Sequence, residues 1–307
     1  MVVYLALALV LFLAISVAKD SLTFANVKAS ACQSAPCTSS DPAACCSYAV
    51  ESARFPGASA PLEVTYTTTD GLMHGWYMVN DTAPADGAAG WLTVLYSHGS
   101  GANVAVNYRQ ERYSWLLRQG RVRVFVYDYP GYGKSEGSPS YGGTQRAAVG
   151  AASWLQAKTN LSSDANVTYL GRSLGGNVAV EAIARGGGQS TRLVLQSTFG
   201  SWGSNFQALM PFLGWAMAPG FGGEFDANSA ALDWSLRDNA CVHQSHSKTD
   251  EWVPFSQGEA LFKTIKPVVN PPGCASTFFE EDGPLHDDPL TPAAKASLGA
   301  WLKGARF

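Results

Sequence analysis

The chain has 307 residues, of which 46% are hydrophobic and 15% are charged, and its net charge at neutral pH is -3. This length and apolar content are typical of one large globular domain with a well-filled core, and they exclude a disordered or fibrous chain. No run of lysine or arginine occurs, so the sequence has no electrostatic footprint for nucleic acid. We therefore expect a small-molecule or protein substrate and no nucleic-acid partner.

The first 18 residues, MVVYLALALVLFLAISVA, are almost wholly apolar and end in Ser16-Val17-Ala18. A small residue, any residue and a second small residue typically precede signal cleavage, so the segment predicts a secretory signal peptide and a secreted protein. The run also lacks a positive residue at its start and is near the lower length for a membrane span. These features leave an uncleaved signal anchor open as the alternative to the favoured cleaved signal.

Cysteine usage supports the secretory interpretation. The even number of cysteines is expected where disulfides are stable. The N-terminal four, in a segment spanning 19–58, lack paired C-x2-C spacing and have no histidine among them, so disulfides are favoured over zinc. Their pairing stays open, and lipid attachment at the adjacent pair is an alternative if the segment faces the cytosol. The six cysteines are Cys32, Cys37, Cys45, Cys46, Cys241 and Cys274.

Three N-glycosylation sequons, at Asn80, Asn160 and Asn166, also fit a secreted glycoprotein.

Strand and helix patterns alternate over residues 59–307. Residues 61–69 and 72–80 predict two strands joined by Asp70-Gly71, a strong hairpin turn signal. Segments such as 108–119 and 144–159 have helical apolar spacing and separate further apolar strands, which favours a mostly parallel, doubly wound α/β sheet. In such sheets function gathers at the carboxyl ends of the strands. The further strands are predicted at 91–99, 122–129, 166–171, 192–198, 240–246 and 275–281.

The most informative motif is G-x-S-x-G, formed by Gly171, Ser173 and Gly175 in VTYLGRSLGGNVAV. It falls between a predicted strand and the helix-forming segment 177–185, which is the context of a nucleophile elbow. The alternative is an ordinary glycine-rich loop. A serine hydroxyl is a poor nucleophile at neutral pH, so Ser173 needs a base and an acid that orients the base.

Chain order selects the partners of Ser173. In this fold the acid and then the histidine follow the serine, and His286 is the histidine that follows the last predicted strand. Asp250, just past the strand 240–246, is the best-placed acid. His243 and His246 point to opposite faces of a strand and do not form a metal pair. The competing acids are Asp226, Asp233, Asp238 and Glu251, and the alternative for His286 is a surface loop histidine.

Two backbone N–H groups are expected to form an oxyanion hole. Leu174 follows the nucleophile, and Ser100 in the His98-Gly99-Ser100-Gly101 loop is the second expected donor. We expect a structural role for His98. The mechanism requires no metal or organic cofactor.

The ordered motifs SHGSG, YDYPGYGKSEG, GRSLGG, QSTF, HSKTDEWVP and GPLHDD resemble the α/β-hydrolase-domain serine hydrolases related to serine aminopeptidases, over residues 60 to 305. GRSLGG and QSTF most resemble the Bem-type single-pass membrane branch. The resemblance implies that Ser173, Asp250 and His286 are nucleophile, acid and base, and that the aspartate of the YDYPGYG loop is structural. Two residues depart from the family pattern, Ser247 and Leu285, where glycine is usual. PGYGKS is not a phosphate-binding loop, because Asp128 stands where that motif needs glycine.

Substrate choice depends on a cap region predicted at about 199–234. Its first part, 199–225, is rich in Phe, Trp, Met and Gly, and it forms either an apolar lid or part of the core. A short lid suits a modest ester, a thioester or a monoacyl lipid. We therefore favour a carboxylic-ester or thioester hydrolase over a serine peptidase or a catalytically silent binding protein. Cys241 and Cys274 are expected to open neighbouring strands, which predicts a disulfide between them.

Overall fold

The computed structural model describes residues 23–26, 28, 32, 45–48, 55, 60–80, 90–210, 214, 221, 223–266 and 274–304. Three subjects of prediction lie outside the described residues: the apolar segment 1–18, Cys37 and most of 211–222 in the cap region. Among the helices that are described, none combines the length and apolarity needed to cross a bilayer.

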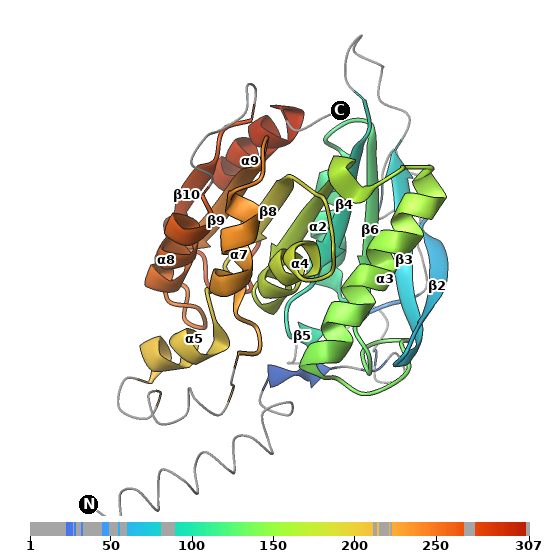
Figure 1. The fold of residues 1–307 in the computed structure, drawn as a ribbon, viewed down its shortest axis with the longest axis horizontal. Helices are drawn as coiled ribbons and strands as arrows, with labels where there is room; N and C mark the ends of the chain where they lie inside the picture. Colours follow the sequence, from blue (N-terminus) through green and yellow to red (C-terminus); the bar gives the residue numbers. More distant parts are fainter. Residues whose placement is uncertain are drawn as a thin grey trace, which may run out of the picture.

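An eight-stranded sheet runs through the domain in the order β10-β9-β8-β7-β4-β6-β3-β2 (Figure 1). The hairpin predicted at Asp70-Gly71 joins β2 and β3, which are antiparallel, and β3 is antiparallel to β6. The other neighbours are parallel, so the predicted mostly parallel sheet is confirmed. The strands are β2 (Leu62–Thr68), β3 (Gly71–Asn80), β4 (Leu92–Ser97), β6 (Val122–Tyr127), β7 (Val167–Arg172), β8 (Arg192–Gln196), β9 (Cys241–Ser247) and β10 (Thr277–Glu281).

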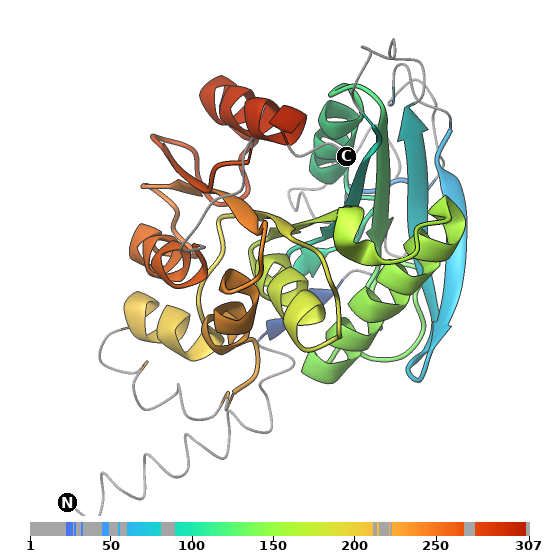
Figure 2. The same cartoon turned by 45° about the horizontal axis from the view of Figure 1, so that its top comes forward.

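Helices cover both faces of the sheet (Figure 2). One core contains apolar side chains of α3, α4, α7 and α8, and the other contains those of α2 and α9. The doubly wound arrangement follows because each parallel crossover places a helix against a face of the sheet. The helices are α2 (Asn107–Leu117), α3 (Tyr141–Thr159), α4 (Leu174–Ala184), α5 (Trp202–Leu209), α7 (Ala227–Ser235), α8 (Phe255–Ile265), α9 (Pro292–Gly304) and the short 3-10 helix Asp164–Asn166.

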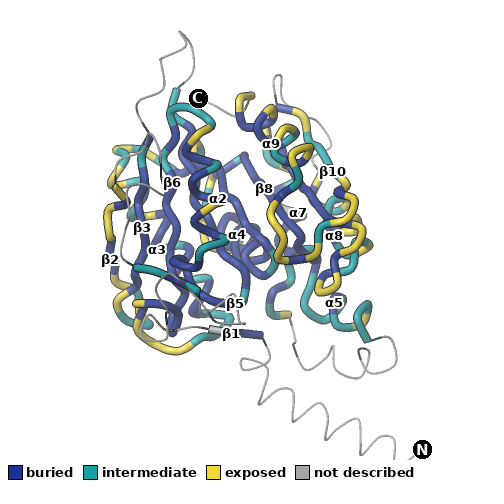
Figure 3. Tube along the Cα trace, turned by 180° about the vertical axis from the view of Figure 1, so that it is seen from behind, coloured by how far each residue is buried: buried dark blue, intermediate teal, exposed yellow. Residues whose placement is uncertain are grey.

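Burial separates the central strands from the edge (Figure 3). Every residue of β4, β7, β8 and β9 is buried, whereas β2 alternates between buried and exposed residues. Strands covered on both faces read as continuous apolar runs, and an edge strand with one covered face alternates. The buried central strands provide a rigid base for the loops at their carboxyl ends.

The fold bears on two further predictions, the disulfide between Cys241 and Cys274 and the glycosylation sequons. The disulfide between Cys241 and Cys274 is present, with Cα atoms 6.0 Å apart, although β10 begins only at Thr277. The sequon at Asn80 is buried and its amide donates a hydrogen bond to the Leu117 carbonyl, whereas Asn160 and Asn166 are exposed. Glycan attachment at Asn80 would therefore require this part of the fold to open.

The cap region contributes to the core where it is described. Phe199, Phe225 and Trp234 are buried with the side chains of the helix layer that contains α4. Trp202 at the start of α5 stacks on Phe199, with ring centroids 4.7 Å apart. These described residues therefore pack as core with the helix layer that contains α4.

Candidate active site

Ser173 lies at the turn between β7 and α4, with φ 53° and ψ -128°. A positive φ is costly for a residue with a side chain, so the surrounding structure must hold it. The Ser173 N–H donates to the Gln196 carbonyl over 2.9 Å. Its own carbonyl accepts from the Gly176 N–H at 2.9 Å and from the Thr198 hydroxyl at 2.7 Å. The strained turn at the carboxyl end of β7 is thus fixed on both sides.

The motif glycines are required by close packing around this turn. A Cβ on Gly171 would collide with the carbonyl of Gly175, and a Cβ on Gly175 would collide with the carbonyl of Ser97. A side chain at either position would push α4 away from the sheet. The predicted sequence of strand, tight turn and helix is therefore confirmed, with a packing reason for each glycine.

His286 and Asp250 form a hydrogen-bonded pair beyond the ends of β10 and β9. The Nδ1 atom of His286 lies 2.9 Å from Oδ1 and 2.8 Å from Oδ2 of Asp250. Oδ1 of Asp250 also accepts from the backbone N–H of Trp252 at 3.0 Å and of Val253 at 2.7 Å. Both members of the pair are buried, with 6% of His286 and 8% of Asp250 exposed. These bonds fix the carboxylate and, through it, the imidazole.

The pKa of Asp250 reflects this environment. Burial raises the pKa of the carboxyl, but its hydrogen bond and charge interaction with His286 and its bond to the Val253 N–H bring it below the usual value. Asp250 is therefore ionised at neutral pH and accepts the Nδ1–H of His286. Nε2 of His286 is then the ring nitrogen that can take a proton from a nucleophile.

The two departures from the family pattern are accommodated locally. The Ser247 hydroxyl donates to the Pro284 carbonyl over 2.5 Å, and the Thr249 hydroxyl donates to the same carbonyl at 3.0 Å. Ser247 therefore ties the loop of Asp250 to the loop of His286. Leu285 is 52% exposed, so its side chain points away from the packed interior.

The loop after β4 approaches Ser173 from the other side. Gly99 lies so close that a Cβ built on it would be 3.4 Å from the Cβ of Ser173. The next residue, Ser100, is half-buried, and its carbonyl accepts from the Tyr132 hydroxyl at 2.6 Å. Leu174 is the first residue of α4, where N–H groups have no partner within the helix. The two expected oxyanion donors therefore lie on segments that border Ser173.

Arg109, which motif analysis missed, holds this loop from within. Its buried guanidinium donates to the carbonyl of Asn103 at 2.8 Å, to that of Gly99 at 3.3 Å and to that of Gly101. Three carbonyls of one loop thus converge on one cation. Within the sequence, Arg109 is an ordinary charge in a predicted helix, and no local pattern marks it.

The N-terminal segment holds the same loop from outside. β1 (Ala25–Asn26) pairs in parallel with β5 (Gly101–Ala102), directly after Ser100. Residues 45–48 join the following turn, because the Ser47 N–H donates to the Ala105 carbonyl over 3.1 Å. The segment that carries the N-terminal cysteines is thus part of the catalytic edge.

A disulfide lies where these contacts meet. Cys32 bonds Cys46, and the Asn103 side-chain amide contacts both sulfur atoms at 3.5 and 3.6 Å. The carbonyl of Asn103 is the one that accepts from Arg109. The disulfide, Asn103 and Arg109 therefore form a continuous support under the loop of Ser100.

Asp128 and His98 have the structural surroundings that the sequence predicted. Asp128 is fully buried and accepts from the Val104 N–H at 2.9 Å and from the Tyr48 hydroxyl at 2.8 Å, so it joins three segments. Burial, with a smaller effect of Arg109, lowers the pKa of His98 to about 3. His98 is therefore neutral at physiological pH.

His243 and His246 lie on opposite faces of β9, as expected. The His243 ring packs near Trp301 of α9, and the His246 ring packs near Phe255 of α8. Across the described ranges, no group of histidine, cysteine, aspartate and glutamate has an arrangement suited to a metal ion.

The structure thus brings His286 to Asp250, and the loop of Ser100 to Ser173. The Ser173 hydroxyl and His286, both described, form no hydrogen bond with each other. Catalytic hydrogen bonds of this kind are often long without substrate. The strand order β10-β9-β8-β7-β4 places all these loops at one edge of the sheet.

Comparisons with known proteins agree with this fold. A family model described as serine aminopeptidase, S33, matches residues 92–265. Protein bem46 of Schizosaccharomyces pombe is 33% identical over 178 residues, which cover 55% of each chain. Lysophosphatidylserine lipase ABHD12 of Xenopus tropicalis is 27% identical over 185 residues, 57% of this chain and 47% of the relative. The Pyrococcus furiosus esterase Pf2001 superposes with a TM-score of 0.60 at 19% identity, over 80% of this chain and 91% of the esterase.

The fold and the family model define an α/β-hydrolase of the serine hydrolase type, and the resemblance expected from the motifs is confirmed. The chain belongs to the serine aminopeptidase S33 family. Its two described disulfides fit a protein of the secretory pathway or the extracellular space.

Proposed function

We propose that this protein hydrolyses carboxylic esters or thioesters through an acyl-enzyme formed on Ser173. The observation that carries the proposal is the buried His286 and Asp250 pair, at the same sheet edge as a serine held at positive φ. A histidine oriented by a carboxylate is the base that a serine hydroxyl needs.

In the proposed first half-reaction, Nε2 of His286 takes the hydroxyl proton of Ser173 as the oxygen attacks the carbonyl carbon of the substrate. The backbone N–H groups of Leu174 and Ser100 stabilise the negative oxygen of the tetrahedral intermediate. The imidazolium then gives its proton to the leaving alcohol or thiol as the bond between carbonyl carbon and leaving group breaks. Asp250 stabilises the imidazolium and stays ionised.

In the second half-reaction, water gives a proton to His286 and attacks the carbonyl carbon of the acyl-enzyme. The bond between that carbon and the Ser173 oxygen then breaks, the imidazolium returns its proton to the Ser173 oxygen, and a carboxylic acid is released. The same oxyanion donors serve both steps. No redox equivalent or further reactant is needed.

The side chains around the proposed site favour a substrate with an apolar acyl chain. Trp252, two residues after Asp250, is 62% exposed, and Leu285, next to His286, is 52% exposed. On the cap side, Phe206 stacks on Phe221 with ring centroids 4.9 Å apart. Exposed large apolar side chains beside a site favour apolar ligands. The similarity to a lysophosphatidylserine lipase supports the same choice, a monoacyl lipid ester.

A panel of substrates tests this proposal. We expect turnover of p-nitrophenyl esters that rises from acetate to medium acyl chains, and turnover of monoacyl lipids, with little cleavage of aminoacyl amides. Trp252→Ser should lower kcat/KM for the longer esters more than for acetate, and Trp115→Ser, away from these side chains around the proposed site, is the control. Amide cleavage that exceeds ester cleavage would instead establish a peptidase. No turnover of any substrate would favour a binding protein.

A further inference from the structure

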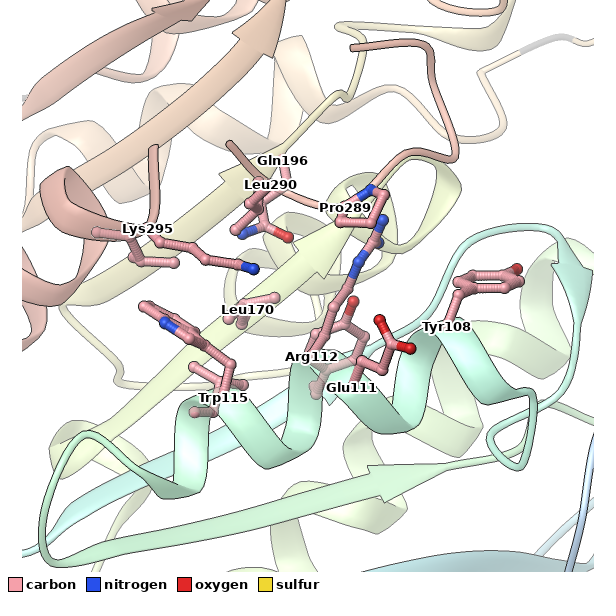
Figure 4. Close-up of a pocket in the computed structure, with 12 residues that line it drawn as sticks. Tyr108, Glu111, Arg112, Trp115, Leu170, Gln196, Pro289, Leu290 and Lys295 are labelled. Atoms are coloured by element: carbon pink, nitrogen blue, oxygen red, sulfur yellow. The ribbon is translucent and has the colours of Figure 1, made fainter. Parts of the chain in front are cut away.

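A second pocket lies on the other side of the His286 loop, between α2 and α9 (Figure 4). Figure 4 shows Glu111, Arg112 and Trp115 projecting from α2, while Lys295 reaches in from α9. Its floor is apolar and includes Leu170 of β7. Neither Ser173 nor His286 lines it, so it is separate from the proposed reaction centre.

Arg112 is buried in the wall of this pocket without a full set of partners. It is 8% exposed, and its Nη2 donates to the Asp288 carbonyl at 2.9 Å and approaches the Asp287 carbonyl at 3.4 Å. Its Nε and Nη1 are buried with no hydrogen-bond partner. A guanidinium stays charged in proteins, and buried charges are normally paired. Two donors of Arg112 therefore lack an acceptor.

Arg172 is a second buried cation close to Arg112, although it does not itself line the pocket. It follows Leu170 by two residues on β7, so its side chain emerges on the same face of the sheet. Arg172 is 5% exposed, and its guanidinium has no hydrogen bond or salt bridge to the part of the chain that the structure describes. Burial and the nearby charge of Arg112 lower the pKa of Arg172 to about 10. The two cations repel each other, and the charges of Asp287 and Asp250 offset this repulsion only in part.

Other groups around the pocket also lack hydrogen-bond or charge partners. The Tyr96 hydroxyl is buried and has no partner. The ammonium of Lys295 points into the pocket (Figure 4) and pairs with none of the described carboxylates. Glu111 is the exposed negative residue at the rim, and it likewise forms no salt bridge with Arg112 or Lys295. The pocket lining thus carries two cations, Arg112 and Lys295, against one carboxylate, Glu111.

We propose that this pocket binds an oxyanion, a carboxylate or a phosphate, on Arg112, with Lys295 at its mouth and the charge of Arg172 nearby. Planar guanidinium groups match both oxyanions in two-point hydrogen bonds. Leu170 and Leu298 would accept a short apolar tail on a carboxylate. Because Arg112 also holds the Asp288 carbonyl, an occupied site would stiffen the loop that follows His286. The proposal does not depend on the proposed hydrolysis.

Binding to the full Ser173→Ala protein tests the site without turnover. Inorganic phosphate and sodium hexanoate are titrated by calorimetry at constant ionic strength, with sodium chloride as the reference. We expect saturable binding of one equivalent of phosphate, hexanoate or both. Binding of one alone identifies its headgroup as the preferred ligand, and binding of both identifies the shared oxyanion. No saturable binding of either would overturn the proposal.

Substitutions of residues around the pocket test whether the measured binding takes place there. Arg112→Gln should weaken binding about tenfold or more, because a buried charged donor is lost. Lys295→Gln should weaken it about threefold, and Glu111→Gln should strengthen it by about the same factor. Arg118→Gln, just after the last residue of α2, and Lys303→Gln, on α9, lie outside the pocket and are the matched controls.

If Arg112→Gln does not fold, the opposite changes at Lys295 and Glu111 remain decisive. Equal affinity in Lys295→Gln, Glu111→Gln and their controls would contradict the assignment.

Discussion

The two described disulfides lie near opposite edges of the sheet, one at the carboxyl ends and one at the amino ends of the parallel strands, and their surroundings differ. Cys32–Cys46 contacts Asn103 in the loop that borders Ser173. Cys241–Cys274 lies at the start of β9, at the edge away from the site. The first belongs to a network that sets the position of a loop, and the second joins the start of β9 to the segment before β10. We infer that activity depends on the catalytic edge and stability on both edges.

Loss of Arg109 should reduce activity more than loss of any other support of the Ser100 loop, at the edge of the sheet that carries Ser173. Arg109→Met removes the donor of three carbonyls in the loop of Ser100. We expect kcat to fall about 100-fold, the effect of removing an oxyanion donor, with a smaller change in KM. Arg109→Lys should recover part of the loss, and Arg118→Met, just after the end of the same helix, should change little.

Steady-state kinetics on an acetate ester measure this effect, with circular dichroism to confirm folding. A folded Arg109→Met protein with wild-type kcat would show that the loop keeps its position without the guanidinium.

Removal of the disulfide at the catalytic edge should have the next largest effect on activity. In Cys32→Ser/Cys46→Ser we expect kcat to fall about tenfold, because the support of Asn103 is lost and the loop is displaced. The bridge spans a sequence separation of 14 residues. In the chain-entropy model its loss lowers the free energy of unfolding by about 3 kcal/mol. Kinetics below the unfolding transition and urea denaturation measure the two effects separately.

The opposite disulfide is the matched comparison. Cys241–Cys274 spans a separation of 33 residues, so its removal should lower the free energy of unfolding by about 4 kcal/mol. We expect kcat of folded Cys241→Ser/Cys274→Ser to stay within about twofold of wild type, because the bridge lies away from the catalytic loops. A tenfold loss of kcat in this variant would remove the distinction between the two edges.

Low pH should lower the free energy of unfolding, because His98 is buried and neutral in the folded protein. The pKa of His98 is lowered to about 3 by burial, whereas the unfolded chain has an ordinary histidine pKa. The unfolded state therefore binds the proton first, and stability falls as pH drops below about 6.5 towards 3. At pH 5 this cost is about 2 kcal/mol.

Urea denaturation at pH 7.5 and 5.0 measures the change in the free energy of unfolding. His98→Asn should lose about 2 kcal/mol less than wild type over this range. Equal losses would mean that His98 takes up a proton in the folded state.

The sequence predicted the parts of this molecule that depend on local pattern. The hairpin at Asp70-Gly71 has a two-residue turn signal, and the turn at Ser173 has fixed glycine spacing. The bridge between Cys241 and Cys274 followed from strand order, because parallel neighbours bring their starting residues together. Asp250 and His286 were selected by chain order, and the structure brings them together.

The supports of the site could not be predicted in the same way. The pairing of β1 with β5 depends on tertiary contacts of a two-residue strand that has no periodicity. Arg109 and Arg112 lie in a helix whose charges look solvated, yet both are buried. The hydrogen bond of Asn80 to Leu117 likewise joins residues far apart in the sequence. Contacts between residues that are far apart in the sequence determine these positions, and no short sequence motif indicates such contacts.

The most direct test of the account is labelling of the protein from residue 19 onward with a fluorophosphonate, which reports an activated serine without knowledge of the substrate. We predict rapid labelling of wild type, none of Ser173→Ala, and labelling slowed at least about 100-fold in Asp250→Asn and His286→Ala. Asp238→Asn, a conservative change at another acid, should label like wild type. Labelling of Ser173→Ala at the wild-type rate, or no labelling of the folded wild type, would contradict the assignment of Ser173 as nucleophile.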